Sequence, residues 1–431
     1  MDLPAALTWL DDHINLEKQV AVAGRIKGLS LDRMRQLVSV LGDPQHAFPV
    51  IHLTGTNGKG STARMLTSIF SESGLSVGTY TSPHLQRLNE RITRNGGPID
   101  DEELAATLSD IAAIESLAGV DPSFFEILTA AAYRWFADVA VDVAVVEVGL
   151  LGRYDATNVA DGQVAVVTNV GHDHTDYEGD WRVRIAREKA GIIKPGSWVV
   201  IGETDPELVP IFQREQAAGG WIRDEDFGLD QNVLAVGGRL LDIRTPAGVV
   251  EQVFLSAHGA HQGDNAAVAA AAAEAFFARP LDPTLIEDAF RAVQLPGRFE
   301  IVGRDPLLVL DGAHNPDGAA AVAQTLEEDF SYGGETILVV GMLQGRDPSA
   351  LLHAMGAAEA SLVVACTPDS PRAHDAATVA RAAADLGTEV VVEPDVARAV
   401  DLAIDEARTD DAVLVAGSLY VVGAARGHLL E

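Results

Sequence analysis

A glycine-rich stretch near the amino terminus has the residues needed to hold a phosphate group. Residues 52–62 read HLTGTNGKGST and follow the apolar run 48–51. Glycines let a backbone approach an anion closely, and Lys59 adds a positive charge at the start of an expected helix. The spacing differs from the common nucleotide-binding loop, because two residues instead of four separate Gly55 from Gly58. A plain strand-to-helix turn with an exposed lysine is the alternative, but three glycines around one lysine favour a phosphate.

Acidic and histidine side chains follow two strand-like runs. VVEVG places Glu147 near the end of one run, and TNVGHDHTD places Asp173 and His174 just after the next. Ligands of open α/β sheets collect at the carboxyl ends of strands, so these residues suit a Mg²⁺ site, although this ion prefers oxygen. The trio that His172 completes also suggests zinc, but no further spaced histidine or cysteine set supports it. Taken singly, each is better explained as a paired or solvated side chain.

Two further segments carry polar residues of less specific pattern. Lys189 lies in REKAGIIKPG, inside a helical stretch where a lysine is ordinarily solvated. Asp311, His314 and Asn315 cluster in DGAHN directly after the strand-like PLLVL. A polar cluster in a tight loop at a strand end indicates a ligand site.

The elements that must position these residues alternate between short valine- and isoleucine-rich runs and helical patterns. The runs are almost continuously apolar, which is typical of strands buried on both faces of a parallel sheet. The runs lie at 141–149, 164–171, 198–202, 336–342, 361–367, 389–394 and 412–418. Helical patterns between them include 101–118, 124–137, 265–278 and 376–386. The predicted class is therefore α/β, with a mostly parallel, doubly wound sheet.

A domain boundary is expected near LPGRFE, where Pro296 and Gly297 break the preceding helix. We predict a large domain over residues 1–296 and a smaller, Rossmann-like α/β domain over residues 297–431, which holds about four strand–helix units. The stretch 221–257 has short β-like pieces and turn glycines, which indicate a small antiparallel excursion.

Composition excludes several classes of protein. The 431 residues carry a formal charge of −32, which repels nucleic acid and anionic membranes, so an anion site must supply its own local positive charge. No run of about 18 uncharged apolar residues is present, and the amino terminus lacks the pattern of a signal peptide. The single cysteine, Cys366, excludes an internal disulfide and fits a reducing compartment. We expect a cytoplasmic protein that binds neither nucleic acid nor membranes.

A set of segments occurs in an order and at distances typical of one enzyme family. They read GLSLDRMRQLVSVLG, IHLTGTNGKGST, TSPHLQRLNERI, EVGLLGRYDATN, DHTD, REKAGIIKPG, LPGRFE and DGAHNP. Together they resemble folylpolyglutamate synthases, often bifunctional as dihydrofolate synthases, within the Mur-ligase superfamily. The glycine-rich loop alone indicates only the superfamily, and its spacing is the Mur-type form of a phosphate loop. SPHLQRLNERI and GRYDATN are specific to the folate branch, and the resemblance covers nearly the whole chain.

The resemblance implies a P-loop-type ATP-binding domain and a role for each matching residue. The ATP phosphates would be held by Asn57, Gly58, Lys59, Gly60, Ser61 and Thr62. Further ATP contacts would come from Asn265, Arg298 and Asp311. Magnesium, expected at two sites, would be held by Ser82, Glu147 and His174. Lys189 matches a lysine that is carbamylated in the family, which turns its amine into a carboxylate-like metal ligand.

The acceptor and glutamate sites are implied in the same way. Arg153, Tyr154 and Asp155 lie in the loop expected to face the pterin or pteroate part of the acceptor. His314 would lie near the reacting groups, and Ser418 near the glutamate. The chain departs from the family pattern at Leu151, where a glycine is usual, at Tyr154, where leucine or phenylalanine is common, and at His172, where the residue is often apolar.

The reaction implied is ATP-dependent addition of L-glutamate to tetrahydrofolate or dihydropteroate through an acyl phosphate, by a monomer that uses Mg²⁺. His314 or Asp173 could help to deprotonate the attacking amine, and the sequence does not choose between them. Three alternatives are a Mur-type ligase for a cell-wall precursor, a P-loop kinase or NTPase, and a nucleotide-binding protein without catalysis. The folate-type segments favour the folate ligase over all three.

Overall fold

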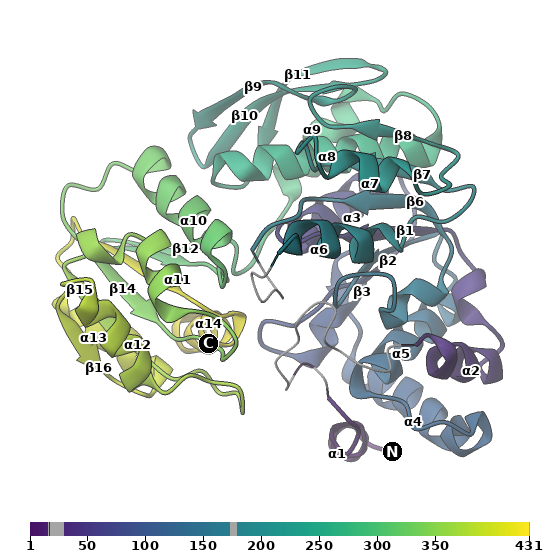
Figure 1. Ribbon diagram of the computed structural model, residues 1–431, viewed down its shortest axis with the longest axis horizontal. Coiled ribbons are helices and arrows are strands. Elements are labelled where there is room, and N and C mark those ends of the chain that lie inside the picture. Colours follow the sequence, from purple (N-terminus) through teal and green to yellow (C-terminus); the bar gives the residue numbers. More distant parts are fainter. Residues whose placement is uncertain (16, 18–29, 173–178, 431) are drawn as a thin grey trace. The chain divides into compact units, whose positions relative to one another are not determined.

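The computed structural model describes residues 1–15, 17, 30–172 and 179–430, and Figure 1 labels its helices and strands. The chain forms two compact units. The N-terminal unit comprises Met1–His84, Leu88–Ser256 and Gln262–Val293, and the C-terminal unit comprises Leu85–Arg87, Ala257–His261 and Gln294–Glu431. Two short segments therefore belong to the C-terminal unit although their chain neighbours belong to the N-terminal one. The predicted domain limits, 1–296 and 297–431, stay a prediction.

The N-terminal unit contains an eight-stranded sheet in the order β4-β3-β2-β5-β1-β6-β7-β8. Neighbours from β2 to β8 in this order run parallel, whereas β3 pairs antiparallel with both β2 and β4. The strands are β1 Val50–Thr54, β2 Val77–Tyr80, β3 Ile92–Arg94, β4 Gly97–Pro98, β5 Val143–Glu147, β6 Gly162–Val167, β7 Trp198–Ile201 and β8 Gly219–Ile222. Strand β1 lies between β5 and β6, so the ends of all three meet at one edge.

Helices cover both faces of this sheet. On β2, Thr79 bonds to Thr67 of helix α3 (Lys59–Glu72), and Gly78 faces Phe136 of α5 (Phe124–Asp138) on the opposite side. Side chains alternate between faces along a strand, so the sheet is buried on both sides. The other helices of this unit's chain are α1 Leu3–Asp11, α2 Asp32–Val40, α4 Asp101–Ala118, α6 Trp181–Ala190, α7 Val209–Gln213, α8 Ala260–Phe277 and α9 Pro283–Ala292.

A separate three-stranded antiparallel sheet follows β8. It pairs in the order β11-β10-β9 and consists of β9 Gly228–Ala235, β10 Gly238–Thr245 and β11 Gly248–Leu255. The turn glycines Gly237 and Gly248 have positive φ angles, which lets tight turns join the strands. This sheet occupies the stretch where the sequence predicts an antiparallel excursion.

The C-terminal unit is a second α/β layer structure whose sheet runs in the order β12-β13-β17-β14-β15-β16. Only β12 is antiparallel to its neighbour, and apolar clusters fill both faces of the sheet. The strands are β12 Glu300–Arg304, β13 Leu307–Leu310, β14 Thr336–Val340, β15 Leu362–Ala365, β16 Val390–Val392 and β17 Ala412–Ala416. The helices are α10 Pro316–Asp329, α11 Pro348–Ala354, α12 Ala376–Asp385, α13 Val396–Glu406 and α14 Leu419–Leu430.

The predicted fold class is confirmed. Each apolar run named above overlaps a strand, and the four helical patterns overlap α4, α5, α8 and α12. Of the helices in the described part of the chain, none is long and apolar enough to cross a membrane.

Candidate functional site

The glycine-rich loop connects β1 to α3, as the sequence predicts. Gly58 stands at the N-cap of α3 with a φ of 82°, in the left-handed region that favours glycine. A Cβ atom at Gly58 would overlap the side-chain oxygen of Asn265, which lies on α8. The first turn of α3 begins at Lys59, so its backbone N–H groups open beside Asn265. This juxtaposition joins two of the predicted ATP contacts at one helix terminus.

The loop is braced by the segment that follows β6. A Cβ atom at Gly55 would overlap the hydroxyl of Thr168, so only glycine fits there. Thr168 Oγ1 donates to the backbone oxygen of Asn57 at 2.6 Å, and Asn57 N donates to Asn169 Oδ1 at 2.9 Å. Thr56 N also donates to the backbone oxygen of Asn169 at 3.0 Å. Thr168 and Asn169 are absent from the predicted site. The sequence feature that could have pointed to them is their position as a polar pair directly after β6, the strand beside β1.

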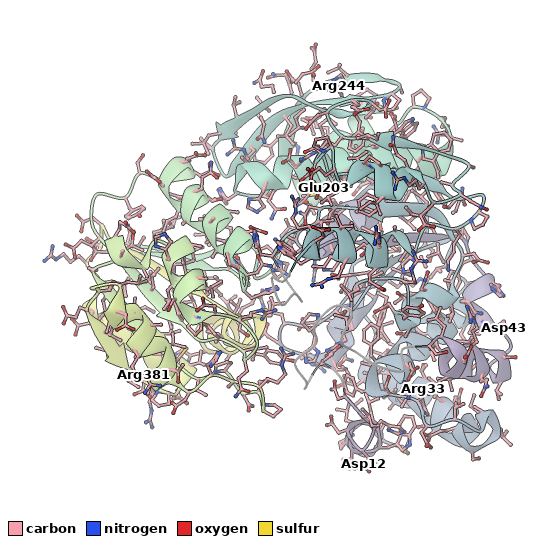
Figure 2. All side chains as sticks on the ribbon, in the orientation of Figure 1. Asp12, Arg33, Asp43, Glu203, Arg244 and Arg381 are labelled. Atoms are coloured by element: carbon pink, nitrogen blue, oxygen red, sulfur yellow. The ribbon has the colours of Figure 1, made fainter. Side chains whose placement is uncertain are left out.

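A buried carboxylate fixes this bracing segment in turn. Glu203, labelled in Figure 2, follows β7. It is 7% exposed. Its Oε2 accepts from Val170 N at 2.7 Å, and its Oε1 accepts from Asp205 N at 2.9 Å. Arg182, at the start of α6, contacts Asp205 and the backbone oxygen of Val170. The β6 segment is thus held between the phosphate loop and the first turn of α6.

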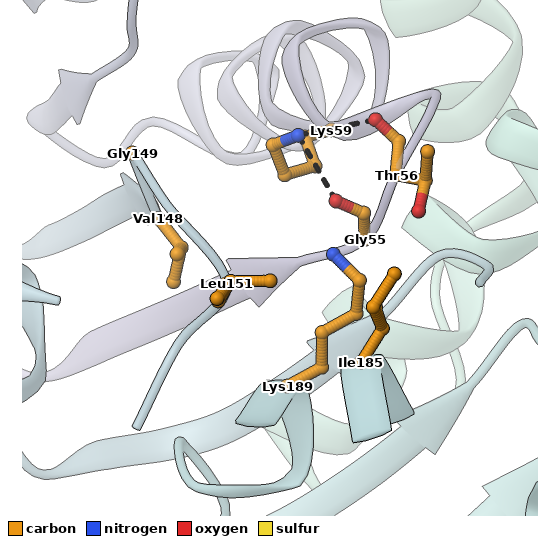
Figure 3. Close-up of a pocket in the computed structure, with 8 residues that line it drawn as sticks. All are labelled: Gly55, Thr56, Lys59, Val148, Gly149, Leu151, Ile185 and Lys189. Atoms are coloured by element: carbon orange, nitrogen blue, oxygen red, sulfur yellow. Dashed lines mark hydrogen bonds between the residues drawn. The ribbon is translucent and has the colours of Figure 1, made fainter. Parts of the chain in front are cut away.

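Two lysines line one small pocket at the phosphate loop. Lys59 Nζ donates to the backbone oxygens of Gly55 and Thr56 at 3.0 and 3.2 Å. Lys189, 4% exposed on α6, points toward the same loop (Figure 3). The rest of the lining consists of Val148, Gly149, Leu151 and Ile185. A lysine such as Lys59 beside a helix N-terminus favours an anion, even in a chain whose net charge is strongly negative.

The predicted metal residues are only partly described. Glu147 ends β5, is 4% exposed, and its Oε2 accepts from Ser82 N at 3.2 Å. A Cβ atom at Gly60 would lie 3.8 Å from the same oxygen, so this carboxylate reaches the first turn of α3. His174 and Asp173 lie outside the described residues. Within the described residues, no three acidic, histidine or cysteine side chains are placed to hold a metal ion.

A carboxylate and a serine hydroxyl fit a hard cation. Mg²⁺ takes oxygen ligands, is usually bound through one or two carboxylates, and keeps several waters and substrate phosphate oxygens. Glu147 supplies such an oxygen beside the helix terminus that would face the phosphates, and Ser82, whose backbone N–H bonds to this carboxylate, would bring a hydroxyl as a second oxygen ligand. The described residues thus fit part of the coordination shell that Mg²⁺ requires.

The loop after β5 is rigid because its polar groups bond to one another. Asp155 is 6% exposed and accepts from Leu150 N and Thr157 N at 2.8 and 3.0 Å. Burial raises the pKa of the Asp155 carboxyl, and these hydrogen bonds oppose the shift. Arg153 binds the Glu215 carboxylate at 3.0 Å, while Tyr154 is 45% exposed. Of the predicted acceptor residues, Tyr154 therefore faces outward and Asp155 inward.

The same loop is bonded to the helix that carries Lys189. Arg153 N donates to the backbone oxygen of Glu188 at 2.9 Å, and Asn158 Nδ2 donates to that of Gly191 at 3.0 Å. A Cβ atom at Gly191 would approach Arg153 Cβ too closely, so glycine is needed at this crossing. The predicted acceptor loop and the predicted carbamylated lysine therefore share one rigid frame.

Leu151, where the family usually has glycine, has a φ of 61°. The left-handed conformation costs a side-chain-bearing residue about 1–2 kcal/mol, while its buried side chain contributes to the core around α6 and β6. Leu151→Ala keeps the strain and loses the packing, whereas Leu151→Gly also removes the strain. We therefore expect Leu151→Ala to lower the free energy of unfolding by about 2–5 kcal/mol, and Leu151→Gly to lower it by about 1 kcal/mol less.

Urea titrations of both variants measure this difference. The order is the reverse of the usual one, because glycine ordinarily destabilises an element relative to alanine. A glycine variant less stable than the alanine variant would contradict the strain assigned to Leu151.

The C-terminal unit gathers a second set of predicted residues at the ends of β13 and β17. Asp311 is 6% exposed and accepts from Phe299 N and Ala313 N, each at 2.7 Å. Burial raises the pKa of its carboxyl, and the charge of Arg298 acts in the opposite direction. A Cβ atom at Gly312 would lie 3.0 Å from Arg298 Nη1, which places the guanidinium over this loop. Arg298 and Asp311 therefore lie together, as two ATP contacts would.

His314 and Ser418 belong to the same cluster. His314 Nδ1 lies 2.8 Å from the backbone oxygen of Gly312, so this nitrogen carries the proton and donates. Gly417 N donates to the backbone oxygen of Ala313 at 3.0 Å, which ties the loop after β17 to the loop after β13. Ser418 is 1% exposed and its Oγ accepts from Tyr420 N at the start of α14. The predicted glutamate-side residues are therefore neighbours within this unit.

Comparison with known proteins identifies the family. The Mur ligase middle domain matches residues 126–273, and the glutamate ligase domain of Mur ligases matches residues 297–419. A dihydrofolate synthase/folylpolyglutamate synthase of Mycobacterium tuberculosis is 38% identical, over 92% of this chain and 89% of that protein. This chain belongs to the folylpolyglutamate synthase family of Mur ligases. The predicted resemblance and the predicted class of enzyme, an ATP-dependent ligase, are confirmed.

Solved folylpolyglutamate synthases share the whole fold. The Mycobacterium tuberculosis enzyme, solved with ADP and AMPPCP, is 36% identical with a TM-score of 0.91, and covers 100% of this chain and 99% of that one. A bifunctional folylpolyglutamate synthase/dihydrofolate synthase, solved with Mn, AMPPNP and L-glutamate, is 30% identical with a TM-score of 0.86, over 100% and 98% of the two chains. The predicted use of ATP and a divalent metal agrees with these complexes.

The roles of individual residues stay predictions. Within the N-terminal unit, the described structure brings together the phosphate loop, Asn265, Ser82, Glu147 and Lys189. The loop with Arg153 and Asp155 adjoins α6, so it lies next to this group. The C-terminal unit separately brings together Arg298, Asp311, His314 and Ser418.

Proposed function

We propose that this folylpolyglutamate synthase relative adds L-glutamate to a carboxylate of tetrahydrofolate, and also of dihydropteroate, at the expense of ATP. The observation that carries the proposal is the pocket in which Lys59 and Lys189 meet at the amino terminus of α3, with the Glu147 carboxylate beside it. A phosphate-binding loop suits any nucleotide enzyme. Lys189 is a second buried lysine, and its helix α6 is bonded to the loop after β5. A simple NTPase does not require such a lysine.

In the first step an oxygen of the acceptor carboxylate attacks the γ-phosphorus of ATP. The bond to the β,γ-bridging oxygen breaks, ADP leaves, and an acyl phosphate forms. Two anions must approach each other, so positive charge and N–H dipoles are needed around the γ-phosphoryl group. Lys59 and the first turn of α3 would supply them.

In the second step the α-amine of glutamate attacks the acyl carbonyl and phosphate leaves, which forms the amide. The amine must first lose a proton, and His314 is our candidate base because its Nδ1–H is held by Gly312. This hydrogen bond leaves Nε2 as the basic nitrogen of the neutral imidazole. Ser418, on the adjoining loop, would help to orient the glutamate.

Divalent metal and a modified lysine complete the proposal. A bound Mg²⁺ would neutralise developing charge on the transferring phosphoryl oxygens, with Glu147, Ser82 and His174 as its protein ligands. Lys189 would carry CO₂ as a carbamate, which replaces a basic amine by an anionic oxygen donor. A second magnesium site, a monomeric state and a cytoplasmic location remain our expectations.

The proposal is tested with purified protein, ATP, Mg²⁺ and labelled L-glutamate, offered each acceptor in a separate reaction. We expect label to enter tetrahydrofolate and dihydropteroate, with ADP and phosphate formed in equal amounts. A cell-wall precursor offered alone tests the other Mur-type activity. Label in that precursor but in neither folate acceptor, or phosphate release that needs no acceptor, would contradict the proposed function.

A further inference from the structure

The segment that follows Ser82 forms a loop with a closed neck and a distant tip. At its neck, Thr81 N donates to the backbone oxygen of Arg91 at 3.0 Å, and Arg91 Nε donates to His84 Nδ1 at 2.9 Å. The Arg91 side chain is 1% exposed and binds both carboxylate oxygens of Glu17, at 2.7 and 2.8 Å. A buried, bidentate ion pair of this kind is geometrically specific. The neck is therefore fixed to the N-terminal unit.

The tip of the loop, Leu85–Arg87, belongs instead to the C-terminal unit. Leu85 packs against the apolar cluster that includes Val422 of α14. Its backbone oxygen lies so close to α14 that a Cβ atom at Gly423 would overlap it. Glycine at position 423 is thus required by the tip, since a mid-helix glycine otherwise weakens a helix.

A polar latch holds the side chain at the centre of the tip. Arg426, one turn further along α14, donates from Nη1 to Gln86 Oε1 at 2.7 Å. Its Nε lies 3.0 Å from both carboxylate oxygens of Glu300, and Glu300 Oε2 accepts from Gly297 N at 2.8 Å. The tip is therefore seated by packing through Gly423 and by a charged hydrogen bond through Arg426.

We propose that residues 85–87 are a tether through which helix α14 positions the backbone of Ser82 beside Glu147. Only Pro83 and His84 separate Ser82 from the tip, and Ser82 N donates to Glu147 Oε2. Gly423, Arg426 and Gln86 act as positioning residues, because they reach the reacting groups only through this loop. The inference rests on the proposed function in one respect, namely that Ser82 and Glu147 serve the phosphoryl transfer.

The sharpest test compares two glycines of the same helix. Gly423→Ala must displace the tip, because the added methyl group meets a backbone oxygen. Gly427→Ala is the matched control, because its Cβ would lie 3.3 Å from the flexible Gln86 side chain. Both substitutions raise the helix propensity of α14 equally. Hydrogen exchange of peptides spanning residues 77–92 reads the loop directly, and glutamate incorporation gives kcat and the Mg²⁺ concentration for half-maximal rate.

We expect Gly423→Ala to speed amide exchange in residues 81–91 at least tenfold and to raise the Mg²⁺ concentration needed for half-maximal rate. We also expect kcat to fall by about 10²-fold, because a 1 Å misplacement has that scale of effect on rate. Gly427→Ala should leave all three within about twofold. Gln86→Ala removes the hydrogen bond from Arg426 without changing the apolar core. This variant tests the tether if Gly423→Ala does not fold. We expect about tenfold faster exchange in the same peptides, from loss of a charge-assisted hydrogen bond.

Equal exchange in residues 81–91 for wild type, Gly427→Ala and the tip variants would overturn the tether. This readout does not depend on the chemistry, so it separates the two proposals. A wild-type protein that makes no amide would refute the proposed function while the exchange data still tested the tether. Faster exchange with unchanged kcat and Mg²⁺ requirement would show a tip that docks without positioning Ser82, which also overturns the inference.

Discussion

Replacing Lys59 with alanine is expected to reduce ATP-driven glutamate incorporation by about 10²–10³-fold, the range found when one charge-stabilising group is removed. Lys59 Nζ donates to two carbonyl oxygens of the phosphate loop, so the amine lies at the N-terminus of α3. Its removal leaves the developing charge on the γ-phosphoryl oxygens without this counter-charge. Initial rates at saturating ATP, Mg²⁺ and acceptor measure the loss directly.

The matched control removes a positive charge far from the loop in sequence. Arg381, labelled in Figure 2, is exposed on α12, where its Nη2 donates to Thr378 Oγ1 of the same helix. Arg381→Ala should keep the wild-type rate within about twofold, because surface substitutions of this kind have small effects. Circular dichroism and thermal melting must show that Lys59→Ala is folded. A folded Lys59→Ala protein with full activity would refute the assignment of the loop.

Replacing Lys189 with alanine is expected to cause a loss of similar size, about 10²–10³-fold, for a different reason. Lys189 is 4% exposed and lines the pocket at the phosphate loop. As a carbamate, the side chain would supply an anionic oxygen ligand. Protein depleted of CO₂ should then regain activity when bicarbonate is added, and Lys189→Ala should not respond.

Carbon-13 NMR gives a readout that does not involve turnover. Wild-type protein equilibrated with labelled bicarbonate should show a carbamate resonance that Lys189→Ala lacks. Lys194→Ala is a suitable control, because Lys194 follows α6, lies outside the pocket and donates to the backbone oxygen of Asn158. Fully active wild-type protein with a bare amine at Lys189 would reject the carbamate while leaving the phosphate loop in place.

The sequence was sufficient for elements whose signal is local. The run before Gly55, the glycines and Lys59 predicted a strand, a phosphate loop and a helix, and the structure has β1, the loop and α3 at these residues. Continuous apolar runs predicted buried parallel strands, because only such strands lack a polar face. The family resemblance added which polar residues belong together.

The parts that sequence reasoning missed depend on which strands are neighbours. Thr168 and Asn169 brace the phosphate loop only because β6 lies beside β1, and Glu203 fixes that brace only because β7 lies beside β6. Strand order is a tertiary property that a local pattern does not contain. The sequence indicates the strain at Leu151, because a leucine stands where the family usually has glycine. It does not indicate that core packing of the leucine side chain compensates for this strain.

Because the C-terminal unit combines Leu85–Arg87 with Gln294–Glu431, the 85–87 tip is synthesised long before the helix against which it packs. The backbone oxygen of Leu85, which lies against Gly423, therefore leaves the ribosome well before α14 does. The N-terminal sheet can therefore assemble during translation, while docking of the 85–87 tip is a late event. A fragment that starts at Gln294 would expose an unfilled notch on α14, and adding a peptide with the sequence around Leu85 should increase its resistance to proteolysis.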